Sequence, residues 1–143
     1  MLIRPYRSAD CPALAELFYE TVHTVCARDY TPEQLDAWAT GEVDLSAWDA
    51  SFLAHRTLAA VEGETIVGFA DMDGSGYLDR LYVHRDFQRR GVASALMDHV
   101  ETLARQAGLG CVLLNSGVRR EDAHAFYQSR GYCRDSWCFD KTL

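Results

Sequence analysis

Residues 79–97 constrain the fold of this chain more than any other stretch, because they pass from a strand pattern to a helix pattern through one small-residue turn. Residues 81–83 read L-Y-V and are β-formers. From Gly91 onward, apolar residues recur at the i, i+3, i+4, i+7 spacing of a helix with one mostly apolar face. A strand that turns into a helix aims unpaired backbone N–H groups and the positive end of the helix dipole at one point. The stretch therefore predicts an anion site, where Gly91 and Ala93 would let a phosphate approach the backbone.

Arginines are the cations available to such a site. Arg80, Arg85, Arg89 and Arg90 surround the turn, where they either bind the anion or form a solvated surface. Lys141 is the only lysine of the chain, which excludes a Walker-type phosphate loop because that loop requires Gly-Lys-Ser/Thr. Any phosphate contact at this turn must therefore use arginine and backbone groups.

Composition bounds the class of protein. A length of 143 residues fits one domain, and we expect residues 1–143 to form it. No apolar run approaches the length of a membrane span, and the first residues carry charge too early for a signal peptide, so a cytoplasmic protein is predicted. The formal net charge of -7 argues against nucleic acid as the main partner. An acidic surface better suits a cationic acceptor such as an amine, although many proteins are acidic for solubility alone.

Cysteine and histidine usage gives no sign of a structural metal or of disulfides. The chain has five cysteines, an odd number without a C-x-x-C pair, which indicates reduced thiols. The five histidines are scattered and lack the spacing of zinc ligands. We therefore predict no metal site.

The pattern along the chain predicts alternating strands and helices. Strands are expected at 2–6, 57–62, 65–72, 77–83 and 111–115, with final strand pieces at 133–135 and 137–141. Helices are expected from 8–12 onward, from Thr31 onward with Pro32 and a capping box closed by Gln34, from Gly91 to about Gln106, and over 120–129. Residues 41–54 suggest a short helix or an ordered flap. This order predicts a single mixed sheet with helices on both faces.

Two motifs resemble those of one known family. Q-R-R-G-V-A at 88–93, after L-Y-V, resembles the acyl-CoA-binding signature of the GNAT superfamily of N-acetyltransferases. The A-x-x-F-Y motif at 123–127, followed by Gly131 and Tyr132, resembles the second GNAT motif. The resemblance implies an α/β (α+β) fold with a mostly antiparallel central sheet and about four helices on both faces. It also implies that the fourth and fifth strands splay apart and hold the coenzyme between them.

The resemblance further implies transfer of an acetyl group from acetyl-CoA to a primary amine, by direct attack in a ternary complex. It assigns coenzyme contacts to Leu81, Tyr82, Val83, Gln88, Arg89, Arg90, Gly91, Val92, Ala93, Ser94, Asn115, Ala123, Phe126 and Tyr127. Arg120 stands where many relatives carry an Asn that touches the pantetheine or substrate, which leaves that contact in doubt. Tyr30, Trp38 and Trp48 are candidates for a wall of the acceptor site, with core packing as the alternative, and Asp71 is a further acceptor-site candidate.

The chemistry needs a base, an oxyanion donor and a group at the leaving thiolate. An alkyl amine has a pKa of about 10.4 and must lose a proton before it attacks. Asp79 is the first candidate base, with Asp71 and Asp73 as alternatives, unless Asp79 only forms a salt bridge. By resemblance, a bulge in the central strand supplies a backbone N–H near Tyr82 for the oxyanion. Tyr127 would sit near the sulfur, either with a lowered pKa or as a hydrogen-bond donor, unless it is only a core tyrosine.

Other interpretations stay open at this point. A non-catalytic acyl-CoA-binding or sensor module would use the same scaffold, and a generic nucleotide binder is disfavoured because no full G-x-G-x-x-G is present. Aromatic residues near the expected site favour a small-molecule acceptor over a peptide. A homodimer, which is common in the family, is left open.

Overall fold

The computed structural model describes residues 1–135 and 141 and contains a five-stranded sheet in the order β1-β2-β3-β4-β5. The strands are β1 (Leu2–Pro5), β2 (Arg56–Glu62), β3 (Thr65–Met72), β4 (Tyr77–Val83) and β5 (Leu113–Leu114). Strands β1 to β4 pair antiparallel, whereas β5 lies parallel to β4. The predicted mixed and mostly antiparallel sheet is confirmed, and the β2–β3 hairpin and β4 begin and end within one residue of the expected positions.

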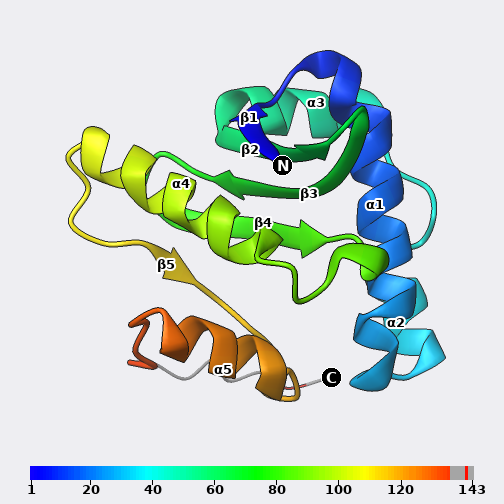
Figure 1. The fold of residues 1–143 in the computed structure, drawn as a ribbon. Coiled ribbons are helices and arrows are strands. Elements are labelled where there is room, and N and C mark those ends of the chain that lie inside the picture. The colour runs from blue at the N-terminus through cyan, green and yellow to red at the C-terminus, as the bar shows by residue number, and fades with distance from the viewer. Residues whose placement is uncertain (136–140, 142–143) are drawn as a thin grey trace.

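Helices cover both faces of this sheet (Figure 1). They are α1 (Cys11–Thr24), α2 (Pro32–Trp38), α3 (Leu45–Ala54), α4 (Val92–Gln106) and α5 (Glu121–Ser129). Short 3-10 turns lie at Ser8–Asp10, Cys26–Arg28 and Arg85–Phe87. Within residues 1–135 and 141, no helix is long and apolar enough to cross a bilayer.

The core divides into two clusters, one on each face of the sheet. On one face, Leu96, Met97 and Val100 of α4 are fully buried against apolar residues of β2 and β3. On the other face, α1, α2 and α3 bury an aromatic cluster around Phe52 and Phe69. The first cluster positions α4, which follows the loop after β4. The second cluster positions α2, which faces β4 from the other side of the sheet.

Local capping explains where α2 and α3 begin. Thr31 accepts a hydrogen bond from the Gln34 N–H while the Gln34 side chain accepts one from the Thr31 N–H, which is the expected capping box. Asp44 caps α3 in the segment whose pattern was ambiguous. There Phe52 is buried but Leu53 is 60% exposed, so α3 lacks the one-sided pattern that would have marked it as a helix.

Strands β4 and β5 part after a very short contact. Their pairing is limited to Tyr77 with Leu113 and Leu78 with Leu114, so β5 is two residues long where five were expected. Beyond Leu78, the β4 edge that faces β5 has no strand partner among the described residues, which confirms the splayed arrangement. The expected strand piece at 133–135 is wrong, because these residues carry no strand pairing, and residues 137–140 lie outside the described part of the chain.

The close approach of α4 to the sheet depends on Gly68 in β3. A methyl group at this position would lie 2.9 Å from Cγ1 of Val92 and 3.1 Å from the backbone oxygen of Tyr82. Since the backbone oxygen cannot move aside, we expect Gly68→Ala to destabilise the protein by about 1–3 kcal/mol, as overpacked cores are. Urea unfolding measures the change. Gly74→Ala is the matched control, because a methyl group there meets nothing within 4 Å, and equal stability of the two variants would contradict the prediction.

Candidate active site

The turn between β4 and α4 leaves the first backbone amides of α4 without a side-chain cap. Gly91 is the N-cap residue with φ 81°, and no side chain in the described part of the chain bonds to the amides that follow it. Arg89 also has a left-handed backbone, with φ 61°, the only such non-glycine residue among those described. The Gln88 side chain donates to the Val83 carbonyl and so holds the turn against the end of β4. Left-handed residues beside uncapped helix amides form a concave anion site.

The four arginines near this turn lie in different surroundings. Arg89 is 87% exposed, and the Arg90 guanidinium lies 5.2 Å from the centre of the Phe87 ring. Arg85 pairs with its neighbour Asp86 at 3.9 Å. Arg80 points to the aromatic cluster instead, with its guanidinium carbon 5.0 Å from the centre of the Trp48 ring and 4.7 Å from the centre of the Phe52 ring. Arg89 and Arg90 therefore remain as cations directly at the turn.

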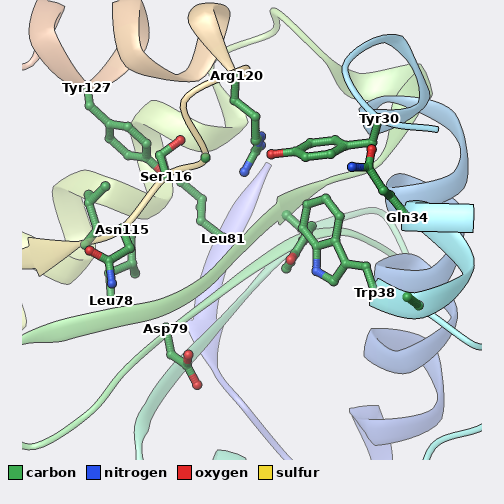
Figure 2. Close-up of a pocket in the computed structure, with 14 residues that line it drawn as sticks. Tyr30, Gln34, Trp38, Leu78, Asp79, Leu81, Asn115, Ser116, Arg120 and Tyr127 are labelled. Carbon is green, nitrogen blue, oxygen red and sulfur yellow. The ribbon is translucent and has the colours of Figure 1, made fainter. Parts of the chain in front are cut away.

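A cavity of about 530 Å³ lies where β4 and β5 part (Figure 2). Its lining comes from α2 and the residues before it, from β4, and from the segment between β5 and α5. The lining residues are Tyr30, Gln34, Ala37, Trp38, Leu78, Asp79, Leu81, Tyr82, Leu114, Asn115, Ser116, Gly117, Arg120 and Tyr127. The fold thus brings Asp79 and Tyr127, far apart in sequence, to one cavity together with the aromatic residues Tyr30 and Trp38.

Tyr127 reaches this cavity from α5. Its ring packs against Phe126 and Tyr132, with ring centres 5.3 Å and 5.8 Å away. Burial raises the pKa of the Tyr127 hydroxyl, and the nearby positive charge of Arg120 only partly opposes this. No hydrogen-bond partner for the hydroxyl is found among residues 1–135 and 141. The side chain is therefore a neutral hydroxyl with a proton to donate, rather than a tyrosine with a lowered pKa.

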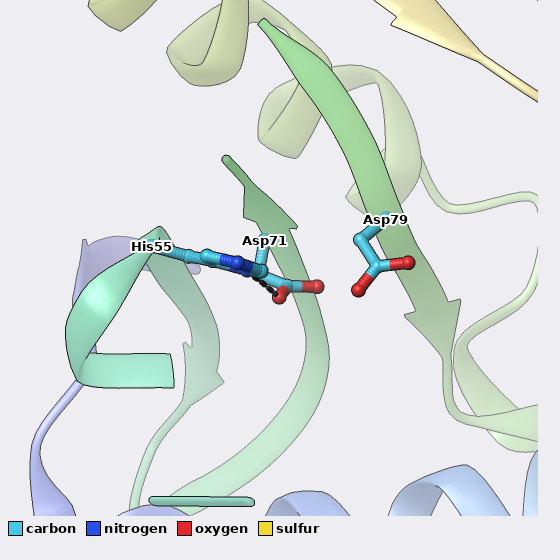
Figure 3. A group of neighbouring side chains, drawn as sticks. All are labelled: His55, Asp71 and Asp79. Carbon is cyan, nitrogen blue, oxygen red and sulfur yellow. Dashed lines mark hydrogen bonds and ion pairs between the residues drawn. The ribbon is translucent and has the colours of Figure 1, made fainter. Parts of the chain in front are cut away.

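The three candidate bases occupy distinct positions, and Figure 3 shows two of them, Asp71 and Asp79. Asp79 lines the cavity, is 40% exposed, and lies 3.3 Å from an Arg80 nitrogen. Asp71 is fully buried and does not line the cavity, where an acceptor contact had been expected. Asp73 binds its own turn through Ser75 and Tyr77, and these hydrogen bonds lower the pKa of its carboxyl. Among the three, only Asp79 can reach a molecule in the cavity.

The buried carboxylate of Asp71 lies beside two nitrogen-bearing side chains. Nδ1 of His55 lies 2.7 Å from Asp71 Oδ2, and Nε of Arg80 lies 3.6 Å from Asp71 Oδ1. Burial raises the pKa of the Asp71 carboxyl, and the charge of Arg80 and the hydrogen bond with His55 oppose that rise. Asp71 therefore orders the strand ends behind Asp79 instead of facing the cavity. No motif in the sequence indicated His55, because its partner is sixteen residues away in the chain.

The irregularity in the central strands lies at Asp79, not near Tyr82. Asp71 pairs with Arg80 but Met72 pairs with Leu78, so Asp79 is the extra residue of a bulge. His84 N–H donates to Val67 O at 2.8 Å. Hydrogen-bonded and non-hydrogen-bonded residue pairs alternate along an antiparallel ladder, so every second N–H of β4 points to β3. The N–H of Tyr82 therefore points to β3, whereas those of Leu81 and Val83 point to the open side. The donor expected near Tyr82 stays a prediction, for which the N–H groups of its neighbours Leu81 and Val83 have the required direction.

Other expected site residues lie around the cavity or away from it. Asn115 lines it and donates from its side chain to the Tyr77 hydroxyl at 3.2 Å. Ala123 and Phe126 do not line it, and Val92 is 3% exposed, so Val92 could offer only its backbone to a ligand. Trp48 packs on Phe18 and Phe52 and does not line it. Residues 88–94 lie outside the lining as well, at the far end of β4.

Sequence reasoning missed several lining residues. Gln34, Ser116 and Gly117 carry no motif that could have indicated them. Arg120 was identifiable only as a departure from the family pattern, yet its guanidinium lies over the Trp38 ring at 5.9 Å from the ring centre. The positive charge of Arg120 in the cavity is therefore the main feature that the sequence motifs did not predict.

Comparison with known proteins identifies the family. The model of the acetyltransferase (GNAT) domain matches residues 26–140 of this chain. The chain belongs to the GNAT family of acetyltransferases. It is an N-acetyltransferase enzyme, as its relatives are, which favours catalysis over the alternative of a non-catalytic acyl-CoA-binding module. The GNAT family uses acetyl-CoA as its acyl donor.

Individual relatives agree with this assignment. The chain is similar to the uncharacterized N-acetyltransferase YhdJ of Bacillus subtilis, with 43% identity over 66% of this chain and 81% of the relative. It is also similar to an aminoalkylphosphonate N-acetyltransferase of Salmonella typhimurium, with 30% identity over 71% of this chain and 76% of the relative. A solved GCN5-related N-acetyltransferase from Rhodopseudomonas palustris superposes with a TM-score of 0.87, 32% identity, and coverage of 94% and 82%. The GNAT fold expected from the sequence is confirmed.

The contact between Gly117 and Tyr30 holds one wall of the GNAT cavity in place. A methyl group at Gly117 would overlap the hydroxyl oxygen of Tyr30. We therefore expect Gly117→Ala to be destabilising and Tyr30→Phe, which removes that oxygen, to make room for the methyl group. The double variant should lose less unfolding free energy than the sum of the losses of the two single variants, by on the order of 0.5–3 kcal/mol.

Urea unfolding of the four proteins in this cycle measures the coupling. Gly110→Ala serves as the control for a glycine whose added methyl group meets nothing within 4 Å. Additive free energies of unfolding for Gly117→Ala and Tyr30→Phe would mean that the two residues do not touch.

Proposed function

We propose that this enzyme transfers the acetyl group of acetyl-CoA to a primary amine of a small molecule, by direct attack in a ternary complex. One observation supports this most: Asp79, Tyr127 and Leu81, whose amide points outward from β4, meet at a single cavity where β4 and β5 part. The cavity volume of about 530 Å³ lies in the range typical of small-molecule sites.

The coenzyme would extend along β4 from the helix start to the cavity. Its pyrophosphate would bind the amides of residues 88–94, with Arg89 and Arg90 beside it. Its pantetheine amides would bond to the open β4 edge at Leu81 and Val83, as a further strand would. The thioester would then lie beside Tyr127, with Asn115 near the arm. The uncapped amides of α4 and the unpaired edge of β4 support this path, because both offer donors without partners among the described residues.

The amine would lose its proton to Asp79, directly or through water, before it attacks. The position of Asp79 at a bulge supports this role, since bulges re-aim side chains next to active sites. The tetrahedral intermediate carries an oxyanion that an outward amide of β4 can bind. A positioned donor of this kind is worth roughly 2.7–4 kcal/mol.

Tyr127 would donate a hydrogen bond to the sulfur as negative charge develops there. Full proton transfer to a thiolate is uphill for an ordinary phenol, because a thiol has a pKa of about 8.5 and a tyrosine about 10. The raised pKa of Tyr127 makes that transfer still less favourable. Hydrogen-bond donation needs no transfer and fits a neutral, unpaired hydroxyl.

A small acceptor is supported by the shape of the cavity and by one relative. Tyr30 and Trp38 form an aromatic wall, with ring centres 5.4 Å apart, that closes the side away from β5. The Salmonella relative is named for aminoalkylphosphonates, which are small amines. Amino acids, aminoalkylphosphonates, polyamines, aminoglycosides and lysine peptides, assayed by release of free thiol, form the panel that tests the proposal. Turnover of lysine peptides alone would contradict it.

At the helix start, we expect Arg89→Ala to weaken acetyl-CoA binding, with the loss largest at low ionic strength because salt screens an exposed charge. Calorimetric titration with acetyl-CoA at two salt concentrations measures this. Arg56→Ala, which removes an exposed arginine on β2, should leave the affinity unchanged. Equal affinities of wild type and Arg89→Ala would show that Arg89 is only a solvated charge.

At the thiolate, we expect Tyr127→Phe to lower kcat at least 10-fold while the Kd for acetyl-CoA changes little, because the hydroxyl acts only as charge develops on sulfur. Steady-state thiol release and acetyl-CoA titration give the two quantities. Tyr132→Phe is a control that removes a half-buried phenol bonded to Glu101. An unchanged kcat in Tyr127→Phe would exclude a role for this hydroxyl in the reaction.

A further inference from the structure

We propose that Arg120 is an anion subsite of the acceptor cavity, so that the acceptor carries a carboxylate or phosphonate group in addition to its amine. This inference rests on the proposed function and names the class of amine. It assigns to Arg120 the task of orienting the acceptor rather than touching the coenzyme.

The guanidinium of Arg120 is held inside the cavity by aromatic packing. Arg120 immediately precedes α5 and lines the cavity together with Trp38 and Tyr30. Its guanidinium carbon lies 5.9 Å from the centre of the Trp38 ring. Figure 2 shows the side chain extending from the start of α5 toward the Tyr30 hydroxyl and the Trp38 indole. An arginine placed over an aromatic face keeps the N–H donors at its edge available for a planar or tetrahedral oxyanion.

The charge of Arg120 has no carboxylate partner in the part of the chain that the structure describes. Among the described residues, the adjacent Glu121 forms no ion pair with it, and Asp122 instead binds Arg28 at 2.6 Å and lies 3.9 Å from Arg89. Arg80, which does not line the cavity, has both Asp79 and Asp71 as ion-pair partners. A half-buried cation without a counter-ion is costly, and an anionic ligand offsets that cost.

The groups that face Arg120 are neutral. Its charge acts on the thiol of Cys26 and on the phenols of Tyr82 and Tyr127, and burial raises the pKa of each of the three. The neighbouring Arg119 points elsewhere and donates to the Gln34 side chain at 3.1 Å. Among the described residues, no acidic group therefore pairs with Arg120, which leaves an anionic ligand as its partner.

The two ends of the cavity therefore differ in charge. Asp79 lies on one side and Arg120 on the other (Figure 2). An amine with an anionic group matches this arrangement, since the amine meets the carboxylate and the anion meets the guanidinium. A diamine or polyamine would bring a second positive charge toward Arg120, which disfavours it.

Matched pairs of acceptors test the proposal. β-Alanine is compared with β-alaninamide, and 2-aminoethylphosphonate with its diethyl ester, so that each pair differs in the anion and the two pairs separate carboxylate from phosphonate. We expect the wild type to prefer the anionic member of at least one pair. Arg120→Gln should lower kcat/KM for that member by on the order of 10- to 100-fold, mainly through KM, as loss of a hydrogen bond to a charged group does. Arg120→Lys should recover part of the loss.

Controls separate this role from the others. Arg105→Gln removes the same charge from an exposed position on α4 and should leave all four acceptors unchanged. A higher KM for acetyl-CoA in Arg120→Gln, with an unchanged ranking of acceptors, would overturn the proposal in favour of a coenzyme contact. An equal fall in kcat for every acceptor would overturn it in favour of an effect on the leaving thiolate.

Binding gives a readout that does not need turnover. Titration of each acceptor into the enzyme with bound CoA, followed by tryptophan fluorescence, measures affinity directly. Weaker binding of the anionic member to Arg120→Gln, together with equal binding of the neutral member, supports the subsite. Absence of turnover with every amine would defeat the proposed function, and equal affinity of wild type and Arg120→Gln for the anionic acceptor would defeat the subsite alone.

Discussion

The unpaired edge of β4 is the constraint on which the site depends. Among the described residues, strand β5 pairs with β4 at only two positions, and the outward amides of Leu81 and Val83 have no strand beside them. A buried amide without a partner costs free energy, so an edge inside the molecule must be satisfied by water or by a ligand. The coenzyme's pantetheine amides are the groups of acetyl-CoA that can bond to such an edge. The opening that makes β4 available to a ligand is also the opening that forms the cavity.

Both sides of this opening are fixed by contacts outside it. On one side, Gly68 lets α4 lie close to β3 and β4, so that the start of α4 stays aligned with the end of β4. On the other side, Arg130 of the α5 C-cap binds Asp98 at 2.6 Å and Glu101 at 3.0 Å on α4, while Asp122 binds Arg28 at 2.6 Å. These ion pairs tie α5 to two separate parts of the fold. Tyr127 on α5 and Arg120 directly before it are therefore positioned by contacts other than the short pairing of β5.

The sequence predicted the parts of the fold that rest on local chemistry. The β2–β3 hairpin, β4, the α2 capping box and the long α4 each follow from alternation, turn residues or helical spacing, and all lie where expected. The extent of β5 was overestimated, because an apolar run does not show whether a neighbouring strand stays beside it. The bulge at Asp79 depends on the register between two strands, which no single-strand pattern contains. For the same reason, the sequence could not separate buried Asp71 from cavity-lining Asp79.

Charge shows why the overall composition was a weak guide to the acceptor. A formal net charge of -7 favours the approach of a cation over distances comparable to the Debye length. Inside the cavity, the same molecule presents a carboxylate at Asp79 and a guanidinium at Arg120. The long-range field acts on the encounter, whereas the groups within hydrogen-bond reach act on the bound state, where charge is screened less. An amine that also carries an anion satisfies the bound state at both ends. Selection by local groups at a partly enclosed cavity therefore outweighs the sign of the whole surface.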